Sequence, residues 1–237
     1  MSALLRPDEA PEWLTGLVTA CSGVSPDDVP LRRRPTGSGR EAAVMLLFGE
    51  GEDGPDVLLT ERAASLREHA GQVAFPGGGL DDADGTGLDG IVTAGLRETL
   101  EETGADPDGI VPLTTLPAVT IPVSGFAVTP VVAYWARSSA VGVVDPGETA
   151  AVVRVPLAEL TDPARRFSVT SPGGYVGPAF AVRGLLVWGF TAVVLSWVFD
   201  LAGWTVPWDV DDVRDLDDAW AHRNDEAARR REGETIR

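Results

Sequence analysis

Residues 95–105, which read GLRETLEETGA, carry the pattern from which an architecture and a chemistry can be inferred. This segment places Glu98, Glu101 and Glu102 within five positions of one helical stretch. Like charges at such spacings repel each other by roughly a few tenths of a kcal/mol per pair. The glutamates therefore form either a solvated acidic face or a set of ligands for a positive ion.

The residues around the glutamates predict a helix over 91–103 that ends at Gly104, because glycine readily adopts the left-handed conformation after a helix. On a wheel of 3.6 residues per turn, one apolar stripe about 80° wide faces the core. Its members are Val92, Leu96 and Leu100. The glutamates lie on roughly the opposite side, where Ala94 and Gly95 leave room beside them. Carboxylates three and four residues apart suit a hard divalent cation such as Mg²⁺.

Two neighbouring features favour an ion site over a solvated face. The glycine turn in FPGGG, at residues 75–79, precedes the helix and lets backbone groups approach the carboxylates. Arg97 stands beside Glu98, where it can brace Glu101 one turn later or contact a phosphate. Mg²⁺ held by carboxylates and substrate phosphates is the usual arrangement for phosphate chemistry.

The rest of the chain alternates strand-like and helix-like segments, which predicts an α/β sandwich with a mixed sheet. Strands rich in β-branched residues are expected at 43–49, 56–62, 72–79, 110–119, 127–136 and 150–157, with a hairpin at 165–171 and 175–182. Helices are expected at 10–21 and near 187–201, and the acidic-then-basic tail is expected to be helical in part.

Charge and hydropathy exclude several classes of protein. With 36 acidic and 19 basic residues, the net charge of −17 argues against nucleic acid or an anionic membrane as a partner.

The uncharged run 184–199 is shorter than the roughly 18–20 residues that span a bilayer, so we expect a buried helix there. The start of the chain lacks the apolar core of a signal peptide. A single cysteine, Cys21, fits a reducing compartment and an apolar slot. A soluble, cytoplasmic protein is expected.

The segment GLRETLEETGA resembles the second half of the Nudix signature, Arg-Glu-apolar-x-Glu-Glu-x-Gly-apolar, and Gly78 resembles the glycine that opens it. Upstream, LLTERAASLREHAGQVAFPGG at 58–78 is similar to the extended motif of the coenzyme A pyrophosphatase branch of the Nudix hydrolases. The matching residues are Leu58, Leu59, Thr60, Arg62, Leu66, Arg67, His69, Gly71, Gln72, Phe75, Pro76, Gly77 and Gly78. The resemblance runs from about residue 40 to residue 200.

The sequence departs from the signature between the glycine turn and the helix. Gly78 and Arg97 are 19 positions apart, which is longer than in the signature and predicts an inserted loop at 83–90. The mid-loop glutamate of the signature is absent. Asp81 and Asp84 match aspartates of the branch, and Asp89 is a further stand-in.

The resemblance implies one Nudix-type α/β/α sandwich with a mixed β-sheet over 1–237, with a core at about 40–200 and both ends as extensions. It also implies Mg²⁺- or Mn²⁺-dependent cleavage of the diphosphate of coenzyme A or acyl-coenzyme A. The products would be 3′,5′-ADP and 4′-phosphopantetheine or its acyl form. Glu98 and Glu102 would be the principal metal ligands, with Glu101 assisting and the Gly78 carbonyl close by.

The remaining candidate residues surround the diphosphate. Arg62 and Arg67 offer bidentate phosphate contacts, or otherwise form ordinary ion pairs. His69 is expected either to bond the backbone of the glycine turn at 77–78 or to contact phosphate. Together with the glutamates, Arg97 and Glu148 complete the catalytic set, Glu148 as an activator of water, as a further metal ligand or as a solvated loop carboxylate.

Two other functions stay open. One is a Nudix hydrolase for another nucleoside diphosphate derivative, such as ADP-ribose, NADH or a dinucleoside polyphosphate. The other is a non-catalytic module that senses a nucleotide, although a pure binder has no reason to keep repelling carboxylates. Pairing with a second copy to form a homodimer is left open as well.

Overall fold

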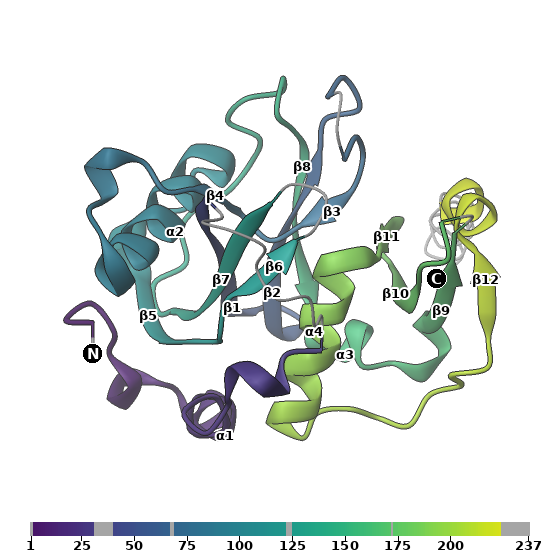
Figure 1. Cartoon of the computed structure of the whole chain (residues 1–237), viewed down its shortest axis with the longest axis horizontal. Coiled ribbons are helices and arrows are strands. Elements are labelled where there is room, and N and C mark those ends of the chain that lie inside the picture. Colours follow the sequence, from purple (N-terminus) through teal and green to yellow (C-terminus); the bar gives the residue numbers. More distant parts are fainter. Residues whose placement is uncertain (1, 31–39, 67–68, 122–124, 172, 224–237) are drawn as a thin grey trace.

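A mixed eight-stranded β-sheet forms the centre of the protein in the computed structural model, which describes residues 2–30, 40–66, 69–121, 125–171 and 173–223 (Figure 1). Its strands are β1 (Glu41–Gly51), β2 (Gly54–Arg62), β3 (Val73–Ala74), β4 (Gly77–Gly79), β5 (Ile110–Thr115), β6 (Val119–Ile121), β7 (Phe126–Trp135) and β8 (Thr149–Pro156). The order is β3-β2-β1-β7-β5, with β4 beside β1, β6 beside β7 and β8 beside β2. β1 and β7 run parallel, whereas the other pairs in this sheet are antiparallel.

Helices cover both faces of this sheet, as the α/β sandwich prediction requires (Figure 1). They are α1 (Glu12–Cys21), α2 (Gly87–Thr103), α3 (Leu157–Leu160) and α4 (Gly189–Ala202). Successive side chains of β1 point to opposite faces, because the side-chain period of a strand is two residues. Met45 therefore packs with Ile91 of α2, while Leu46 joins a second core with Leu14 of α1 and Leu195 of α4. The predicted fold class is confirmed.

A smaller four-stranded sheet lies beside the central sheet (Figure 1). It contains β9 (Arg166–Thr170), β10 (Val176–Val182), β11 (Leu185–Val187) and β12 (Val213–Asp215) in the order β11-β10-β9-β12. The predicted hairpin is confirmed as β9 and β10. β12 pairs in parallel with β9, and residues 216–223 continue from it as a helix. The expected partial helicity of the tail is thus confirmed for its described part.

The structure corrects two details of α2. The helix starts at Gly87 rather than at residue 91, so half of the predicted loop at 83–90 belongs to the helix. The predicted core stripe is also rotated, because Leu100 is 43% exposed. The buried residues are Gly90, Ile91, Val92, Ala94, Gly95, Thr99 and Thr103. Gly95 faces the sheet so closely that an added Cβ would lie 2.9 Å from Met45 Cε, so small residues let this face of the helix approach β1.

Two other segments differ from expectation. The run 184–199 contains the short strand β11 before helix α4 begins, rather than one buried helix. The strand expected at 72–79 divides at Phe75 and Pro76 into β3, which pairs with β2, and β4, which pairs with β1. Within the part of the chain that the structure describes, every helix is too short or too polar to cross a bilayer.

Candidate active site

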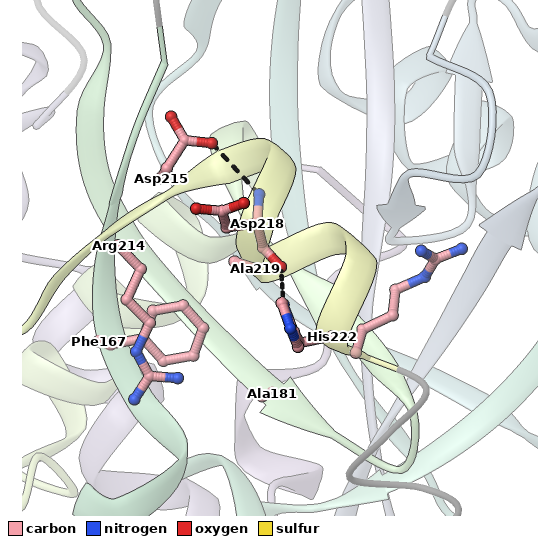
Figure 2. Close-up of a pocket in the computed structure, with 8 residues that line it drawn as sticks. Phe167, Ala181, Arg214, Asp215, Asp218, Ala219 and His222 are labelled. Carbon is pink, nitrogen blue, oxygen red and sulfur yellow. Dashed lines mark hydrogen bonds between the residues drawn. The ribbon is translucent and has the colours of Figure 1, made fainter.

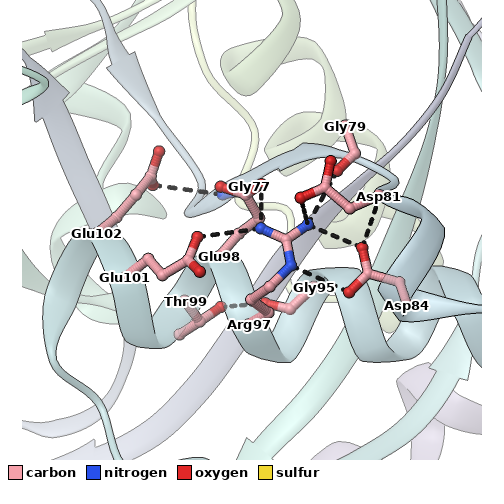
Figure 3. Close-up of polar contacts among 10 residues, drawn as sticks. All are labelled: Gly77, Gly79, Asp81, Asp84, Gly95, Arg97, Glu98, Thr99, Glu101 and Glu102. Atoms are coloured by element: carbon pink, nitrogen blue, oxygen red, sulfur yellow. Dashed lines mark hydrogen bonds and ion pairs between the residues drawn. The ribbon is translucent and has the colours of Figure 1, made fainter.

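The candidate active site lies where α2 crosses the glycine strand β4 (Figure 3). The Gly77 N–H donates to Glu102 Oε2 at 3.3 Å. Glu98 lies beside Gly78, and a Cβ on that glycine would come within 2.4 Å of the Glu98 carboxyl carbon. Contrary to the predicted wheel, these two glutamates therefore border the buried face of α2 and lie against the sheet.

Arg97 organises the outer side of this site (Figure 3). Its Nε and Nη2 donate to the two carboxylate oxygens of Asp84 at 3.0 and 2.8 Å, and Nη2 also donates to the Gly79 carbonyl. Nη1 donates to Glu98 at 2.8 Å and to Glu101 at 3.0 Å, so Arg97 braces Glu101 as its spacing suggested. The Glu101 side chain is 55% exposed and turns toward Arg97 rather than toward β4.

Sequence reasoning matched Asp84 to an aspartate of the branch but did not predict its contact with Arg97, of which it is the main partner. Its side chain is 2% exposed, and the Arg97 hydrogen bond holds the pKa of Asp84 below its ordinary value. Asp81 lies 3.8 Å from Arg97 with a side chain that is 73% exposed. Asp89 lies elsewhere and accepts a hydrogen bond from the Ser2 hydroxyl. Spacing within the helix could not have identified this contact, because Asp84 lies in the 3-10 turn before α2, 13 positions from Arg97.

Burial disfavours the ionised form of the two inner glutamates, Glu98 and Glu102. Burial is the main cause that raises the pKa of Glu102 to about 7, and the negative charge of Glu98 adds to it. The Gly77 N–H and the charge of Arg62 act in the opposite direction. Burial also raises the pKa of Glu98, although the hydrogen bond from Arg97 lowers it. Such a pair favours a cation that reaches both carboxylates.

Arg62 and Glu148 lie close enough to Glu102 for their charges to act on it. Arg62 lowers the pKa of Glu102 and Glu148 raises it. The Nε of Arg62 is buried and has no hydrogen-bond partner among the described residues. Glu148 is exposed, and its carbonyl accepts from the N–H of Ala63, the residue after Arg62. The Arg62 and Glu148 segments therefore lie beside each other, within range of the Glu102 charge.

The described part of the chain shows the surroundings of His69, another predicted substrate ligand. His69 is exposed and adopts a left-handed conformation with φ 58°. Its Nδ1 lies 2.8 Å from Oε1 of Gln72, so the ring contacts a side chain and not the backbone of the glycine turn. The first of the two alternatives for His69, a bond to that backbone, is thus not what the structure shows, and contact with phosphate stays a prediction. Arg67 lies outside the described residues.

The residues present are compatible with a divalent cation. Within the described ranges, no three acidic, histidine or cysteine side chains converge into a complete metal site. Mg²⁺, however, usually keeps several waters and is held by one or two carboxylates together with substrate phosphates. Glu98 and Glu102 supply two such carboxylates, and the absence of a side chain at Gly78 leaves room for them beside the backbone.

A separate hollow of about 320 Å³ lies on the smaller sheet (Figure 2). It is lined by Phe167, Ala181, Arg214, Asp215, Asp218, Ala219, His222 and Arg223. None of the predicted site residues that the structure describes lines it. Two of its polar side chains already have partners, since Arg214 pairs with Asp212 and the His222 ring bonds the Asp218 carbonyl.

Comparisons with known proteins agree with one another. The family model described as NUDIX domain matches residues 38–172, which is more than half of the 237 residues. A Cronobacter sakazakii protein described as an uncharacterized Nudix hydrolase, NudL, is 41% identical over 138 residues, or 55% of this chain and 64% of that protein. The NudL protein of Klebsiella pneumoniae is 40% identical over 128 residues, or 51% of this chain and 59% of that protein. The chain thus spans less than two thirds of these curated relatives.

Solved structures with a related description show partial similarity. The crystal structure of a Nudix hydrolase from M. smegmatis, RenU, has a TM-score of 0.42 and 24% identity, covering 52% of this chain and 74% of that one. The NUDIX domain of Shewanella oneidensis NrtR, complexed with ADP ribose, has a TM-score of 0.40 and 21% identity, covering 58% and 86%.

Proposed function

The chain belongs to the NUDIX family, and from that premise we propose that it is a metal-dependent hydrolase of the diphosphate bond of coenzyme A or acyl-coenzyme A. The reaction adds one water molecule across the phosphoric anhydride and yields 3′,5′-ADP and 4′-phosphopantetheine or its acyl form. The observation that carries the proposal is the pair Glu98 and Glu102, whose carboxylates lie against the glycine strand. The segment LREHAGQVAFPGG at 66–78 supports coenzyme A as the substrate.

We propose Mg²⁺ or Mn²⁺ as the cofactor. Such a cation neutralises negative charge on a diphosphate and lowers the pKa of the water that it binds. Glu98, Glu102 and the Gly78 carbonyl would hold it, with Glu101 assisting. Arg97 keeps the Glu98 carboxylate in one orientation, because its guanidinium is fixed by Asp84 on the other side.

The chain offers groups for the substrate itself at the end of the site near Glu102. The positive charge of Arg62 acts on Glu102, and a guanidinium is a bidentate donor to phosphate, so Arg62 suits contact with the substrate diphosphate. Glu148 is exposed and close enough to influence Glu102, which suits a role in holding or deprotonating the attacking water. Cys21 takes no part, because burial raises the pKa of its thiol to about 12.

A substrate panel tests this proposal. The purified protein is incubated with Mg²⁺ or Mn²⁺ and, separately, with coenzyme A, acetyl-coenzyme A, ADP-ribose and NADH, and the products are identified by mass. Release of 4′-phosphopantetheine, absent from a Glu102→Gln control, is the expected result. AMP and ribose phosphate from ADP-ribose alone would assign the chain to another nucleoside diphosphate derivative. Binding of nucleotides without turnover would contradict a hydrolase and favour a nucleotide sensor.

A further inference from the structure

A segment beyond the family match contacts the turn that follows β2. The NUDIX match ends at residue 172, whereas the helix at 216–223 carries Trp220. The ring of Trp220 lies against Gly71, because a Cβ added to that glycine would lie 2.8 Å from Trp220 Cζ2 and 3.2 Å from Cη2. Gly71 also has a φ of 70°, which residues with a Cβ rarely adopt. The missing side chain at Gly71 makes room for the ring, and the backbone conformation favours glycine at the same position.

The Gly71 turn is connected directly to Arg62 by backbone hydrogen bonds. The Gly71 N–H donates to the Arg62 carbonyl at 3.0 Å, and the Arg62 N–H donates to the Gln72 carbonyl at 3.0 Å. The Gln72 N–H in turn donates to the carbonyl of His69 at 3.1 Å. Any displacement of Gly71 therefore moves the backbone that carries the Arg62 side chain.

Trp220 packs from the helix at 216–223 onto the smaller sheet. Its ring packs against the apolar group that contains Phe167 and Leu186. The guanidinium of Arg223 lies 4.3 Å from the ring centroid and donates to the Trp220 carbonyl at 2.6 Å. β12, which precedes this helix, pairs with β9, and the Ser168 N–H donates to the Asp212 carbonyl at 2.8 Å. The packing of Trp220 and the pairing of β12 thus attach this helix to the smaller sheet.

A charge interaction links the same two segments a second time. Glu61 precedes Arg62 on β2, and the positive charge of Arg223 acts on its carboxylate. Arg223 follows Trp220 by three residues, so the two side chains project from neighbouring positions of one helix. Both contacts therefore join the C-terminal helix to the end of β2.

We propose that Trp220 is a positioning residue, which holds the turn at 69–72 and, through it, Arg62 at the edge of the candidate active site. The inference rests on the proposed function, because it assigns Arg62 to the phosphates of the substrate. A guanidinium that is fixed before binding loses less conformational entropy when it contacts a phosphate. Loss of Trp220 should therefore weaken substrate binding more than it slows the chemical step.

Trp220→Ala and Trp208→Ala in the full-length protein form a matched test. Trp208 lies in the same C-terminal extension, but it stacks on Arg166. With the best substrate of the wild type, Trp220→Ala should raise KM about tenfold and change kcat less than about threefold. This pattern is expected when a variant loses the same binding free energy in the ground state and in the transition state. Trp220→Phe should restore most of the affinity, and Trp208→Ala should keep the wild-type KM.

Hydrogen exchange at the Gly71 and Gln72 amides supplies a readout that needs no substrate. Both amides should exchange faster in Trp220→Ala than in wild type or Trp208→Ala. If Trp220→Ala does not fold, Trp220→Leu is measured in the same way. Wild-type KM and unchanged exchange would overturn the proposal, and so would a rise in KM that Trp208→Ala reproduces. Faster exchange in a protein that cleaves no coenzyme A derivative would support the positioning role and refute the proposed substrate.

Discussion

Glu98 lies so close to Gly78 that no side chain fits between them: a Cβ on this glycine would lie 2.4 Å from Glu98 Oε1. The other Glu98 oxygen would be 2.7 Å away. The position of this carboxylate therefore depends on a missing side chain in the neighbouring strand. Arg97 holds it from the opposite direction with a 2.8 Å hydrogen bond.

Gly78→Ala should displace the Glu98 carboxylate while leaving the fold intact, because the atoms that meet the new methyl group belong to the end of a side chain. We expect kcat/KM to fall by about 100-fold, the scale for losing a major electrostatic group of a site. Gly79→Ala is the matched control, since its Cβ would make an ordinary 3.6 Å contact with Phe126. Equal activity losses in the two variants would refute the role of the close approach.

The glutamate helix could be predicted from its spacing, and its end at Gly104 is confirmed by the left-handed φ of 74° at that residue. The face of the helix that is buried could not be predicted from the sequence. An apolar count places Leu100 inside, whereas the structure buries Thr99 and Thr103, whose hydroxyls donate to the carbonyls one turn back at 2.6 Å. Once these hydroxyls are satisfied within the helix, small residues at this face permit closer packing on the sheet than leucine would.

The contacts of Asp84 and Trp220 could not be predicted from nearby sequence for a different reason. Asp84 precedes Arg97 by 13 positions, and Trp220 follows Gly71 by 149. Spacing within one helix or strand reports on neighbours in that element, whereas these contacts arise only after separate elements pack together. The sequence motif thus located the glutamates and the glycine strand, and the tertiary structure supplied the residues that hold them.

Asp84→Asn should weaken both the fold and the chemistry. The Arg97 guanidinium would lose its bidentate carboxylate partner, so we expect the free energy of unfolding to drop by about 2 kcal/mol. Because Arg97 also orients Glu98, kcat should fall by about tenfold. Chemical denaturation and steady-state kinetics measure the two effects. Asp81→Asn should cost less than about 0.5 kcal/mol, because its side chain is 73% exposed and 3.8 Å from Arg97. A similar loss in both variants would argue against a specific Asp84 contact.

Glu102→Gln should reduce turnover by at least about 100-fold, because it removes a carboxylate that borders the glycine strand. Glu101→Gln is the comparison, and we expect a smaller loss of about tenfold or less, since Glu101 is largely exposed and faces Arg97. Single-turnover rates at saturating Mg²⁺ distinguish the two. A Glu102→Gln protein with near-normal rates would show that the ligand assignment is wrong.

The metal-free protein should lose stability as the pH rises from about 4.5 to about 7. In this window the folded protein holds a proton on Glu102 that the unfolded chain has released, because the pKa is raised from 4.5 to about 7 in the fold. Folding therefore takes up a proton, and the free energy of unfolding should fall by roughly 2–3 kcal/mol across the window from this group. The raised pKa of Glu98 acts in the same direction. The lowered pKa of Asp84 acts below its ordinary value of 3.8, outside the window.

Glu102→Gln isolates this contribution, because glutamine does not titrate while the other acidic groups of the chain remain. Urea unfolding at a series of pH values in the presence of a chelator should show a flatter profile for the variant, which becomes more stable than the wild type above about pH 7. Addition of Mg²⁺ should reverse that order, because a bound cation favours the ionised carboxylate that glutamine cannot supply. If the wild type and Glu102→Gln showed parallel profiles of stability against pH in chelator, the pKa of Glu102 would not be raised in the folded protein, and the prediction would be wrong.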